Sequence, residues 1–405
     1  MTERHRRVLI YSHDTFGLGH LRRCRAIAHA LVEEDKDLSV LILSGSPIIG
    51  SFDFRARVDF VRVPGVIKLR NGEYTSLNLH IRTEETLEMR ASIIQHTADI
   101  FDPDLFIVDK EPLGLRGEVG PTLELLRRRG TPLVLGLRDV MDEPAQLGPE
   151  WSRKKVLPAL KKYYDDIWVY GLPQICEPLV GIDLPQSVRK RMTYTGYLHR
   201  TATAPSTQLT GLGQEPFLLV TPGGGGDGEN LIDWVLQAYE HDANLPCRAF
   251  LVLGPFMQPE LQADFLARAS RLRNVSAITF DARLESLMAH AQGVVAMGGY
   301  NTFCEILSFD KRALIVPRTQ PRLEQYIRTA RAQELGLVQM LVDDGVRDPR
   351  RMATELRQLP QQSLPSQVVV PGLLDGLDSV NRLTRKWLGR SRRPTRIPVA
   401  ASARA

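Results

Sequence analysis

The chain lacks several features that would place it outside the ordinary globular proteins. Only 4 of its 405 residues are cysteines, and they are far apart without a Cys-x-x-Cys spacing, which argues against a disulfide scaffold or a zinc site. No apolar run approaches the roughly 20 residues of a membrane-spanning helix, and the first residues lack the apolar stretch of a signal peptide. We therefore expect a cytoplasmic protein without a transmembrane segment and with reduced cysteines.

Aromatic residues are scarce as well, at 7%, and the net charge of +5 is small for this length. The basic runs at 22–25 and 127–129 lack the interleaved aromatic residues that stack on nucleic-acid bases, so we interpret both as solvated helix faces and expect no nucleic-acid partner. The segment 391–405 has the composition of a disordered basic tail. Peripheral contact with the inner face of a membrane stays open as an alternative.

Strand-like and helix-like segments alternate along both halves of the chain, which is typical of parallel sheets with helices on both faces. Strands are expected at 7–12, 38–43, 58–63, 105–109, 132–137 and 167–170, and then at 217–221, 248–253, 275–280, 294–297, 313–316 and 337–341. The clearest helical patterns cover 21–33, 84–100 and 231–239.

Between these halves lies a polar, turn-rich segment at 201–216, which has the composition of a linker. The pattern predicts an α/β protein with two Rossmann-like domains whose parallel sheets face each other across a cleft. We assign an N-terminal acceptor-binding domain to 1–200, a C-terminal nucleotide-sugar-binding domain to 217–365 and a C-terminal helix to 366–390. Ligands of open α/β sheets bind beyond the carboxyl ends of the strands, so the site is expected in that cleft.

Two glycine-rich turns follow buried strands in the second half. The segment 298–305 reads Gly-Gly-Tyr-Asn-Thr-Phe-Cys-Glu and joins a strand to a helix, where backbone N–H groups can hold a diphosphate and Glu305 can accept ribose hydroxyls. The second turn, at 222–230, contains four consecutive glycines, which allow close approach of a ligand. Together the two turns favour a nucleotide-sugar site.

The first strand ends in a turn that places His20 at the start of a helix. The helix macrodipole disfavours the imidazolium there, so the ring stays neutral, as a general base must be near pH 7. A purely structural role for His20, as a helix cap, remains the alternative at this point.

Three motifs together resemble family 28 glycosyltransferases of the GT-B fold. They are the Gly-x-Gly-His turn at 17–20, the glycine-rich loop at 222–230 and the Gly-Gly-x-x-Thr-x-x-Glu pattern at 298–305. Within that family, the peptidoglycan enzymes that transfer N-acetylglucosamine and form lipid II are the most similar branch. The resemblance covers most of the second domain but only the first turn of the first domain. It implies inverting, metal-independent transfer of a hexose, with N-acetylglucosamine the leading candidate, from a UDP-sugar to an acceptor hydroxyl, without a cofactor.

Residue by residue, the resemblance implies that His20 is the catalytic base and that Glu305 binds the ribose. The implied contacts are the following: donor phosphate, Arg200, Gly224, Gly225, Gly226, Gly299, Tyr300, Asn301 and Thr302; nucleotide base, Phe280 and Asp281; donor sugar, Glu324 and Gln325. No metal ligand is implied. Asp14, Asp109 and Asp139 lie near strand ends and are candidates for contacts with the acceptor or with the catalytic base.

Departures from the family concern the acceptor. The segments 109–111 and 138–139 carry residues unlike those that hold a lipid-linked muramyl acceptor, so the acceptor stays unknown and a membrane-associated one stays open. Two alternatives remain. One is a UDP-sugar 2-epimerase or hydrolase on the same fold, which would use carboxylates in the cleft. The other is a nucleotide-sugar-binding protein without turnover.

Overall fold

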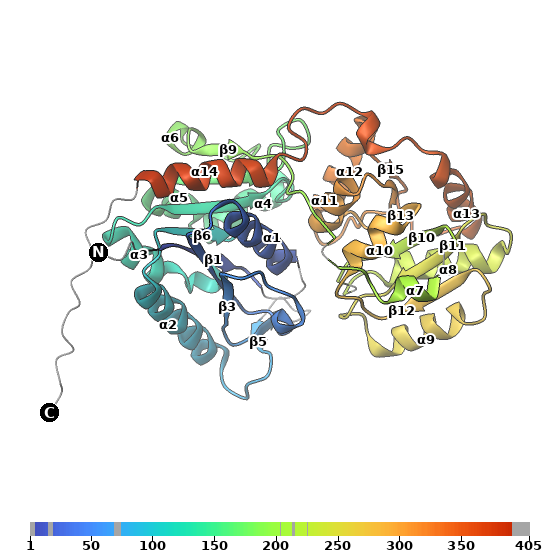
Figure 1. Cartoon of the computed structure of the whole chain (residues 1–405), viewed down its shortest axis with the longest axis horizontal. Coiled ribbons are helices and arrows are strands. Elements are labelled where there is room, and N and C mark those ends of the chain that lie inside the picture. The colour runs from blue at the N-terminus through green and yellow to red at the C-terminus, as the bar shows by residue number, and fades with distance from the viewer. Residues whose placement is uncertain are drawn as a thin grey trace.

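The structure is a computed structural model of the 405-residue chain and describes residues 5–14, 19–68, 74–202, 204–212, 215–224 and 226–390. Two lobes lie side by side, and each is built around a parallel sheet flanked by helices (Figure 1). The expected tail at 391–405 and the turn glycines Gly17 and Gly225 lie outside the described residues.

The N-terminal sheet has seven strands in the order β3-β2-β1-β6-β7-β8-β9, and every neighbouring pair is parallel. The strands are β1 (Arg6–Ser12), β2 (Leu38–Ser44), β3 (Val58–Arg62), β6 (Leu105–Asp109), β7 (Leu133–Arg138), β8 (Asp166–Tyr170) and β9 (Met192–Tyr194). Every residue of β6 and β8 is buried, because helices cover both faces of the sheet.

The helices of the N-terminal lobe form two layers. Apolar residues of α1 (Gly19–Glu34) pack on one face of the sheet, and those of α2 (Thr83–Phe101), α3 (Gly120–Arg128) and α5 (Val156–Tyr163) pack on the other. The remaining elements of this lobe are η1 (Ile49–Ser51), β4 (Val66–Lys68), β5 (Tyr74–Ser76), η2 (Leu115–Gly117), α4 (Pro144–Arg153) and α6 (Gln186–Arg189).

The C-terminal sheet has six parallel strands in the order β12-β11-β10-β13-β14-β15. The strands are β10 (Phe217–Thr221), β11 (Arg248–Val252), β12 (Val275–Ile278), β13 (Gly293–Ala296), β14 (Arg312–Ile315) and β15 (Gln339–Met340). The helices are α7 (Gln208–Leu212), α8 (Glu229–His241), α9 (Pro259–Ala269), α10 (Leu284–His290), α11 (Tyr300–Ser308), α12 (Glu324–Glu334), α13 (Pro349–Gln358), η3 (Leu359–Gln361) and η4 (Pro365–Gln367). Residues of α8, α9 and α13 cover one face, and residues of α10, α11 and α12 cover the other.

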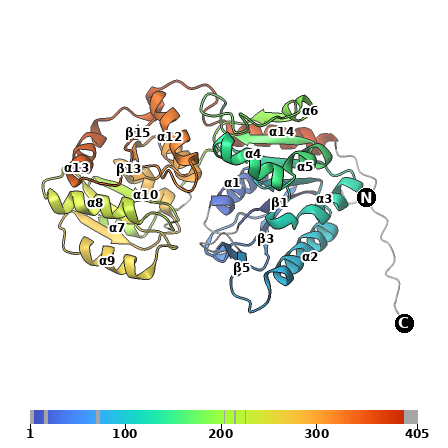
Figure 2. The same ribbon diagram turned by 180° about the vertical axis from the view of Figure 1, so that it is seen from behind.

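The last helix, α14 (Gly376–Arg390), returns to the N-terminal lobe, where both ribbon views place it beside the first sheet (Figures 1 and 2). Val380 and Leu383 join the same apolar cluster as Ile27 of α1. The indole Nε1 of Trp387 donates to Asp166 Oδ2 at 3.1 Å, at the start of β8. The chain therefore passes between the lobes twice.

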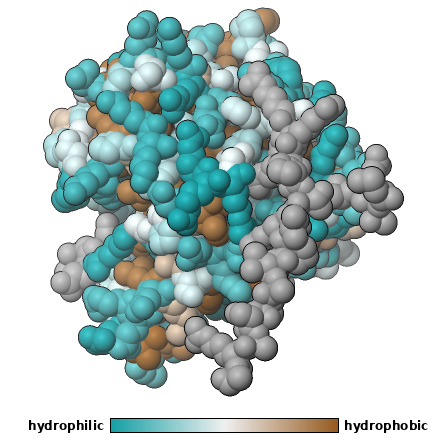
Figure 3. Space-filling view, turned by 90° about the vertical axis from the view of Figure 1, so that its left-hand side faces the viewer, coloured by the Kyte–Doolittle hydropathy of each residue, from teal (hydrophilic) through white to brown (hydrophobic). Residues whose placement is uncertain are grey.

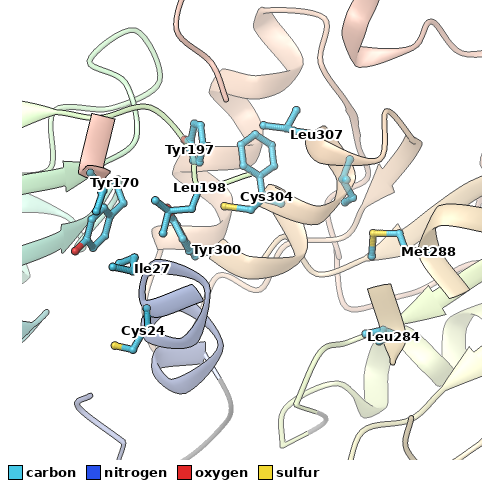
Figure 4. Packing of buried hydrophobic residues seen from close by; sticks show 14 of the residues in the cluster. Cys24, Ile27, Tyr170, Tyr197, Leu198, Leu284, Met288, Tyr300, Cys304 and Leu307 are labelled. Carbon is cyan, nitrogen blue, oxygen red and sulfur yellow. The ribbon is translucent and has the colours of Figure 1, made fainter. Parts of the chain in front are cut away.

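The apolar core is continuous across the junction of the lobes (Figure 4). Tyr197 and Leu198, which follow β9, lie between residues of the first sheet and α11. The ring of Tyr197 contacts those of Tyr300 and Phe303, with centroids 6.0 and 5.1 Å apart. On the side of the N-terminal lobe that faces away from the C-terminal lobe, the surface is mostly hydrophilic, with scattered apolar residues (Figure 3).

The expected strands are present, and most of their ends agree within one or two residues. The strands β4, β5 and β9 have no counterpart among the expected strands, and α7 is a short helix inside the segment expected to be a linker. The four cysteines are free in the structure. Within the described ranges, no helix is both long and apolar enough to cross a bilayer.

Candidate functional site

A cavity of about 450 Å³ lies between the two lobes, and both contribute to its walls. In each sheet the chain first adds strands on one side of its first strand and then on the other side, so the order switches between β1 and β6 and between β10 and β13. Open α/β sheets bind their ligands at such switch points. His20 follows β1, Gly224 follows β10 and Gly299 follows β13, and all three line the cavity. The topology therefore makes the two preferred ligand positions face each other.

Most of the residues expected at the donor site line this cavity, and several do not. The lining includes His20, Gly224, Gly226, Phe280, Asp281, Gly299, Tyr300, Asn301, Thr302, Glu324 and Gln325. Its walls do not include Arg200, Glu305, Asp14, Asp109 or Asp139, as far as the described part of the chain shows. These five side chains are buried around the cavity, each held by protein groups.

His20 is held by a buried carboxylate. Its Nδ1 lies 2.5 Å from Asp109 Oδ2, at the carboxyl end of β6, while Arg23 donates to both oxygens of Asp109 at 2.8 and 2.7 Å. Burial alone would raise the pKa of Asp109, but Arg23 and His20 keep that pKa well below its usual range. An ionised Asp109 only accepts hydrogen bonds, so the proton of a neutral His20 resides on Nδ1 and the lone pair is on Nε2.

Burial lowers the pKa of His20 to about 4, against the opposing effect of Asp109. The ring is therefore neutral near pH 7, as a general base must be. Its neighbour His13 contacts it edge to face, with centroids 5.6 Å apart, and burial lowers the pKa of His13 to about 3. His20 at the cavity wall can take a proton, and Asp109 can stabilise the imidazolium that forms.

Asp14 has a different position. Its Oδ1 accepts from the backbone N–H of Leu21 at 3.1 Å, and its Oδ2 accepts from the Ser44 hydroxyl at 2.6 Å. Burial raises its pKa to about 6. These contacts tie the first turn of α1 to the end of β2, so Asp14 supports the turn that carries His20.

The two glycine turns supply backbone N–H groups to the cavity. Gly223 and Gly298 have φ of +83° and +77°, a backbone conformation that residues with a side chain rarely adopt. A Cβ atom on Gly298 would also lie only 2.7 Å from Cγ2 of Ile315. No side chain caps α11 at its start, so the N–H groups of Tyr300 and Asn301 remain for a ligand. The side chain of Asn301 joins the lobes, since it donates to Gly19 O and accepts from Arg200 Nη2, both at 2.9 Å.

Glu305 is fully buried in this structure and meets an arginine of the other lobe. Arg22 Nη2 lies 2.5 Å from Glu305 Oε1 and donates to Glu285 Oε1 at 2.7 Å. Burial raises the pKa of Glu305 to about 7, although Arg22 lowers it. Arg22 itself lines the cavity, so the carboxylate expected to bind ribose is adjacent to the cavity but behind an ion pair.

At the other end of the cavity, Glu324 and Gln325 begin α12 next to Arg318. The guanidinium of Arg318 donates to Glu324 Oε1 at 2.6 Å and forms an ion pair with Asp227. The backbone N–H of Arg318 donates to Gln325 Oε1 at 3.1 Å. Asp281 accepts from the N–H of Arg283 at 2.6 Å. Glu324, Gln325 and Asp281 therefore place polar side chains on the C-terminal wall of the cavity.

Asp139 forms a buried contact between the lobes. Arg328 donates to both of its oxygens at 2.6 Å, and the Tyr197 hydroxyl donates to Oδ2 at 2.7 Å. Asp139 and Arg328 are both fully buried. The structure therefore places Asp139 in the joint between the lobes, with Arg328 and Tyr197 as its partners.

Sequence reasoning missed the arginines. The interpretation of 22–25 as a solvated helix face is wrong, because the side chains of Arg22 and Arg23 are only 13% and 1% exposed and bind carboxylates of distant strands and helices. Arg138 and Arg318 also line the cavity. Their position in the sequence could have indicated this, because Arg22 and Arg23 lie near the start of a helix that follows the end of a strand, which is where ligands bind in α/β proteins.

The sequence and the structure resemble known proteins in two ways, by one family match and by similarity to solved structures. Residues 218–367 match the glycosyltransferase family 28 C-terminal domain. No curated protein matches the sequence. Solved structures cover nearly the whole chain at low identity. They include Medicago truncatula UGT71G1 in complex with UDP-glucose (14% identity, 95% of this chain and 98% of that one, TM-score 0.60). A second is Acinetobacter baumannii MurG (14%, 94% and 99%, TM-score 0.55).

A third is a putative UDP-N-acetylglucosamine 2-epimerase from Listeria monocytogenes (11%, 97% and 99%, TM-score 0.58). At such identities the likeness shows the fold alone, and the expected GT-B fold is confirmed. The family match adds that the C-terminal domain is of the glycosyltransferase type. The particular resemblance to lipid II-forming enzymes is not confirmed, since transferases of several kinds share the fold equally well.

Proposed function

We propose that the chain is an inverting, metal-independent glycosyltransferase that moves a hexose from a UDP-sugar to an acceptor hydroxyl. The observation that carries this proposal is His20, whose Nδ1 is held by Asp109 while the ring lines a cavity that also contains both glycine turns. In this arrangement Nε2 removes the acceptor proton and Asp109 stabilises the resulting imidazolium. The backbone N–H groups at the start of α11 stabilise the charge on the leaving diphosphate.

The donor site is proposed from the residues on the C-terminal wall. Gly224, Gly226 and Gly299 to Thr302 bind the diphosphate, together with Arg200 through Asn301. Phe280 and Asp281 contact the base, Glu324 and Gln325 contact the sugar, and Glu305 binds the ribose. N-acetylglucosamine is the sugar to test first, because the three motifs resemble those of the enzymes that form lipid II. UDP is supported as the nucleotide by the similar fold of UGT71G1, which was solved with UDP-glucose.

The acceptor is proposed to enter from the N-terminal lobe. A second cavity of about 280 Å³ is lined by His13 and by Tyr74, Leu113, Arg116 and Lys154. His13 touches the ring of His20, so this cavity adjoins the proposed base. We therefore propose this cavity as the place where the acceptor binds.

The alternative of an epimerase or hydrolase needs a free carboxylate at the sugar ring. The carboxylates along the described part of the cavity wall are engaged: Asp227 and Glu324 pair with Arg318, Glu285 pairs with Arg22, and Asp281 accepts from the backbone. The proposal therefore favours transfer, with the neutral histidine as the available base.

The test begins with ligand binding. UDP-, GDP- and dTDP-sugars are screened by thermal shift, because a ligand at 100 times its Kd stabilises the folded state by about 2.7 kcal/mol. UDP release is then measured with a panel of hydroxyl acceptors for the wild type and His20→Ala, with the exposed His96→Ala as the matched control. Stabilisation by UDP-sugars and acceptor-dependent release that only His20→Ala abolishes are expected. Equal release without any acceptor would show a hydrolase, and binding without turnover would show a binding protein.

A further inference from the structure

Two basic residues, Lys110 and Arg138, lie at the carboxyl ends of β6 and β7, which are neighbouring strands of the N-terminal sheet. Arg138 is the last residue of β7 and lines the cavity. Lys110 directly follows β6, the neighbouring strand, and its N–H donates to Gly136 O at 2.7 Å. The Lys110 side chain is 15% exposed, and its backbone adopts a left-handed φ of 64°.

The hydrogen bonds of these two side chains are incomplete. Arg138 Nε is buried without a partner, and no ion pair or side-chain hydrogen bond of Arg138 occurs within the described ranges. The ammonium of Lys110 comes no nearer to a carboxylate than 3.9 Å, to Glu111. A buried guanidinium usually makes several hydrogen bonds, so these two groups depart from the rule that buried charges are paired.

The surrounding carboxylates serve other cations. Three of them act on the pair, and each has a nearer partner: Glu111 binds Lys154 at 3.0 Å, Glu324 binds Arg318 at 2.6 Å and Asp139 binds Arg328 at 2.6 Å. Burial lowers the pKa of Lys110 to about 8, with Arg138 adding to the effect, and burial lowers the pKa of Arg138 to about 10. The positive charge of the pair is therefore poorly compensated in the free protein.

We propose that Lys110 and Arg138 form a binding site for a carboxylate or phosphate group of a substrate. A guanidinium at the cavity wall and an ammonium at the end of the neighbouring strand match such an anion, which would supply the missing hydrogen bonds. Lys110 is next to Asp109, the residue that holds His20, so the bound anion lies near the reacting centre. The proposal rests on glycosyl transfer in this cavity and adds that these two side chains hold an anionic group of the acceptor, of the donor sugar or of the donor diphosphate.

The anion can come from two sources, which binding measurements separate. The full-length variants Arg138→Gln and Lys110→Gln are compared with the wild type, and Arg153→Gln, which alters an exposed arginine of α4, is the matched control. Affinity for UDP is measured by calorimetry. The thermal shift caused by inorganic phosphate is measured with and without saturating UDP.

If the anion belongs to the acceptor or to the donor sugar, both variants bind UDP within about threefold of the wild type, and both lose the stabilisation that phosphate adds to the UDP complex. If the anion is the donor diphosphate, both variants lose about tenfold or more in UDP affinity, and phosphate adds nothing once UDP is bound. Either result supports the site, and Arg138→Lys should retain part of the binding.

Two results would overturn the proposal. One is wild-type binding of both UDP and phosphate by Arg138→Gln and Lys110→Gln. The other is a marked loss of thermal stability in Arg138→Gln without any ligand, because that loss would mean that Arg138 already serves a protein partner. Phosphate binding needs no turnover, so a failure of the anion site and a failure of glycosyl transfer are seen separately.

Discussion

The variant Glu305→Gln tests the proposed ribose contact. The expected loss of UDP affinity follows from the ion pair that Glu305 forms in the structure. A carboxylate that accepts from two ribose hydroxyls makes charge-assisted hydrogen bonds of roughly 1.5–3 kcal/mol. In the free protein, however, Arg22 lies 2.5 Å from Glu305, so the nucleotide must exchange that contact for its own. We therefore expect a loss at the lower end, about tenfold in UDP affinity, which corresponds to about 1.4 kcal/mol.

The fold should survive this change, because Arg22 keeps Glu285 as a partner at 2.7 Å. The same contact predicts the opposite result for Arg22→Gln, which removes the competitor and should strengthen UDP binding at a pH high enough to keep Glu305 ionised, because the loss of Arg22 also raises the pKa of Glu305. Both affinities are measured by calorimetry, with thermal unfolding as the check on the fold. UDP affinity of Glu305→Gln within twofold of the wild type would refute the ribose role.

The pKa of Glu305 gives the prediction a second, independent signature. Burial raises that pKa to about 7 against the effect of Arg22, so the carboxyl group is mostly neutral at pH 6 and mostly ionised at pH 8. Only the ionised form makes the charge-assisted contacts, so wild-type affinity should exceed that of Glu305→Gln most at pH 8 and least at pH 6. The protonation of UDP itself cancels in this ratio. A ratio that does not change with pH would contradict the assignment.

Three further predictions concern turnover. His20→Ala should lower kcat by about 10²–10⁴ with donor affinity near that of the wild type, and turnover within threefold would assign the base to another group. Asp109→Asn should lower kcat as well, and it should also destabilise the fold because Arg23 would lose its buried counterion. In the double variant with His20→Ala, Asp109→Asn should cause no further loss of activity, and a multiplicative loss would show that Asp109 acts separately from His20. Gln325→Ala should reduce the preference for UDP-N-acetylglucosamine over its C4 epimer while leaving UDP affinity nearly unchanged, and the reverse pattern would place Gln325 in the nucleotide pocket.

Local sequence patterns predict the two sheets because parallel strands covered on both faces are short apolar runs, such as 105–109 and 217–221. They also single out segments that line the cavity, since the chain after β1, β10 and β13 contains glycines or a histidine that a plain turn does not need. The weaker strand β9 was missed because its three residues are only half-buried and carry no such run.

Pairings between distant residues could not be predicted in the same way. Asp109 was a candidate partner of the base, but nothing local says that it would hold His20 while Asp139, at the end of the next strand, would hold Arg328. Likewise, the pattern of α1 does not reveal that Arg22 contacts Glu305 in the other lobe. Such choices depend on how two domains meet, and that geometry is not written in any one segment.

The return of α14 to the first lobe has a consequence for the order in which the chain matures during synthesis. Val380 and Leu383 cover the face of the first sheet that α1 also covers, so this face remains incomplete until the end of α14 has left the ribosome. The C-terminal sheet, whose last strand ends at Met340, can by then have formed its own core. Domains usually fold in the order in which they are made, but here the domain that begins first is finished last.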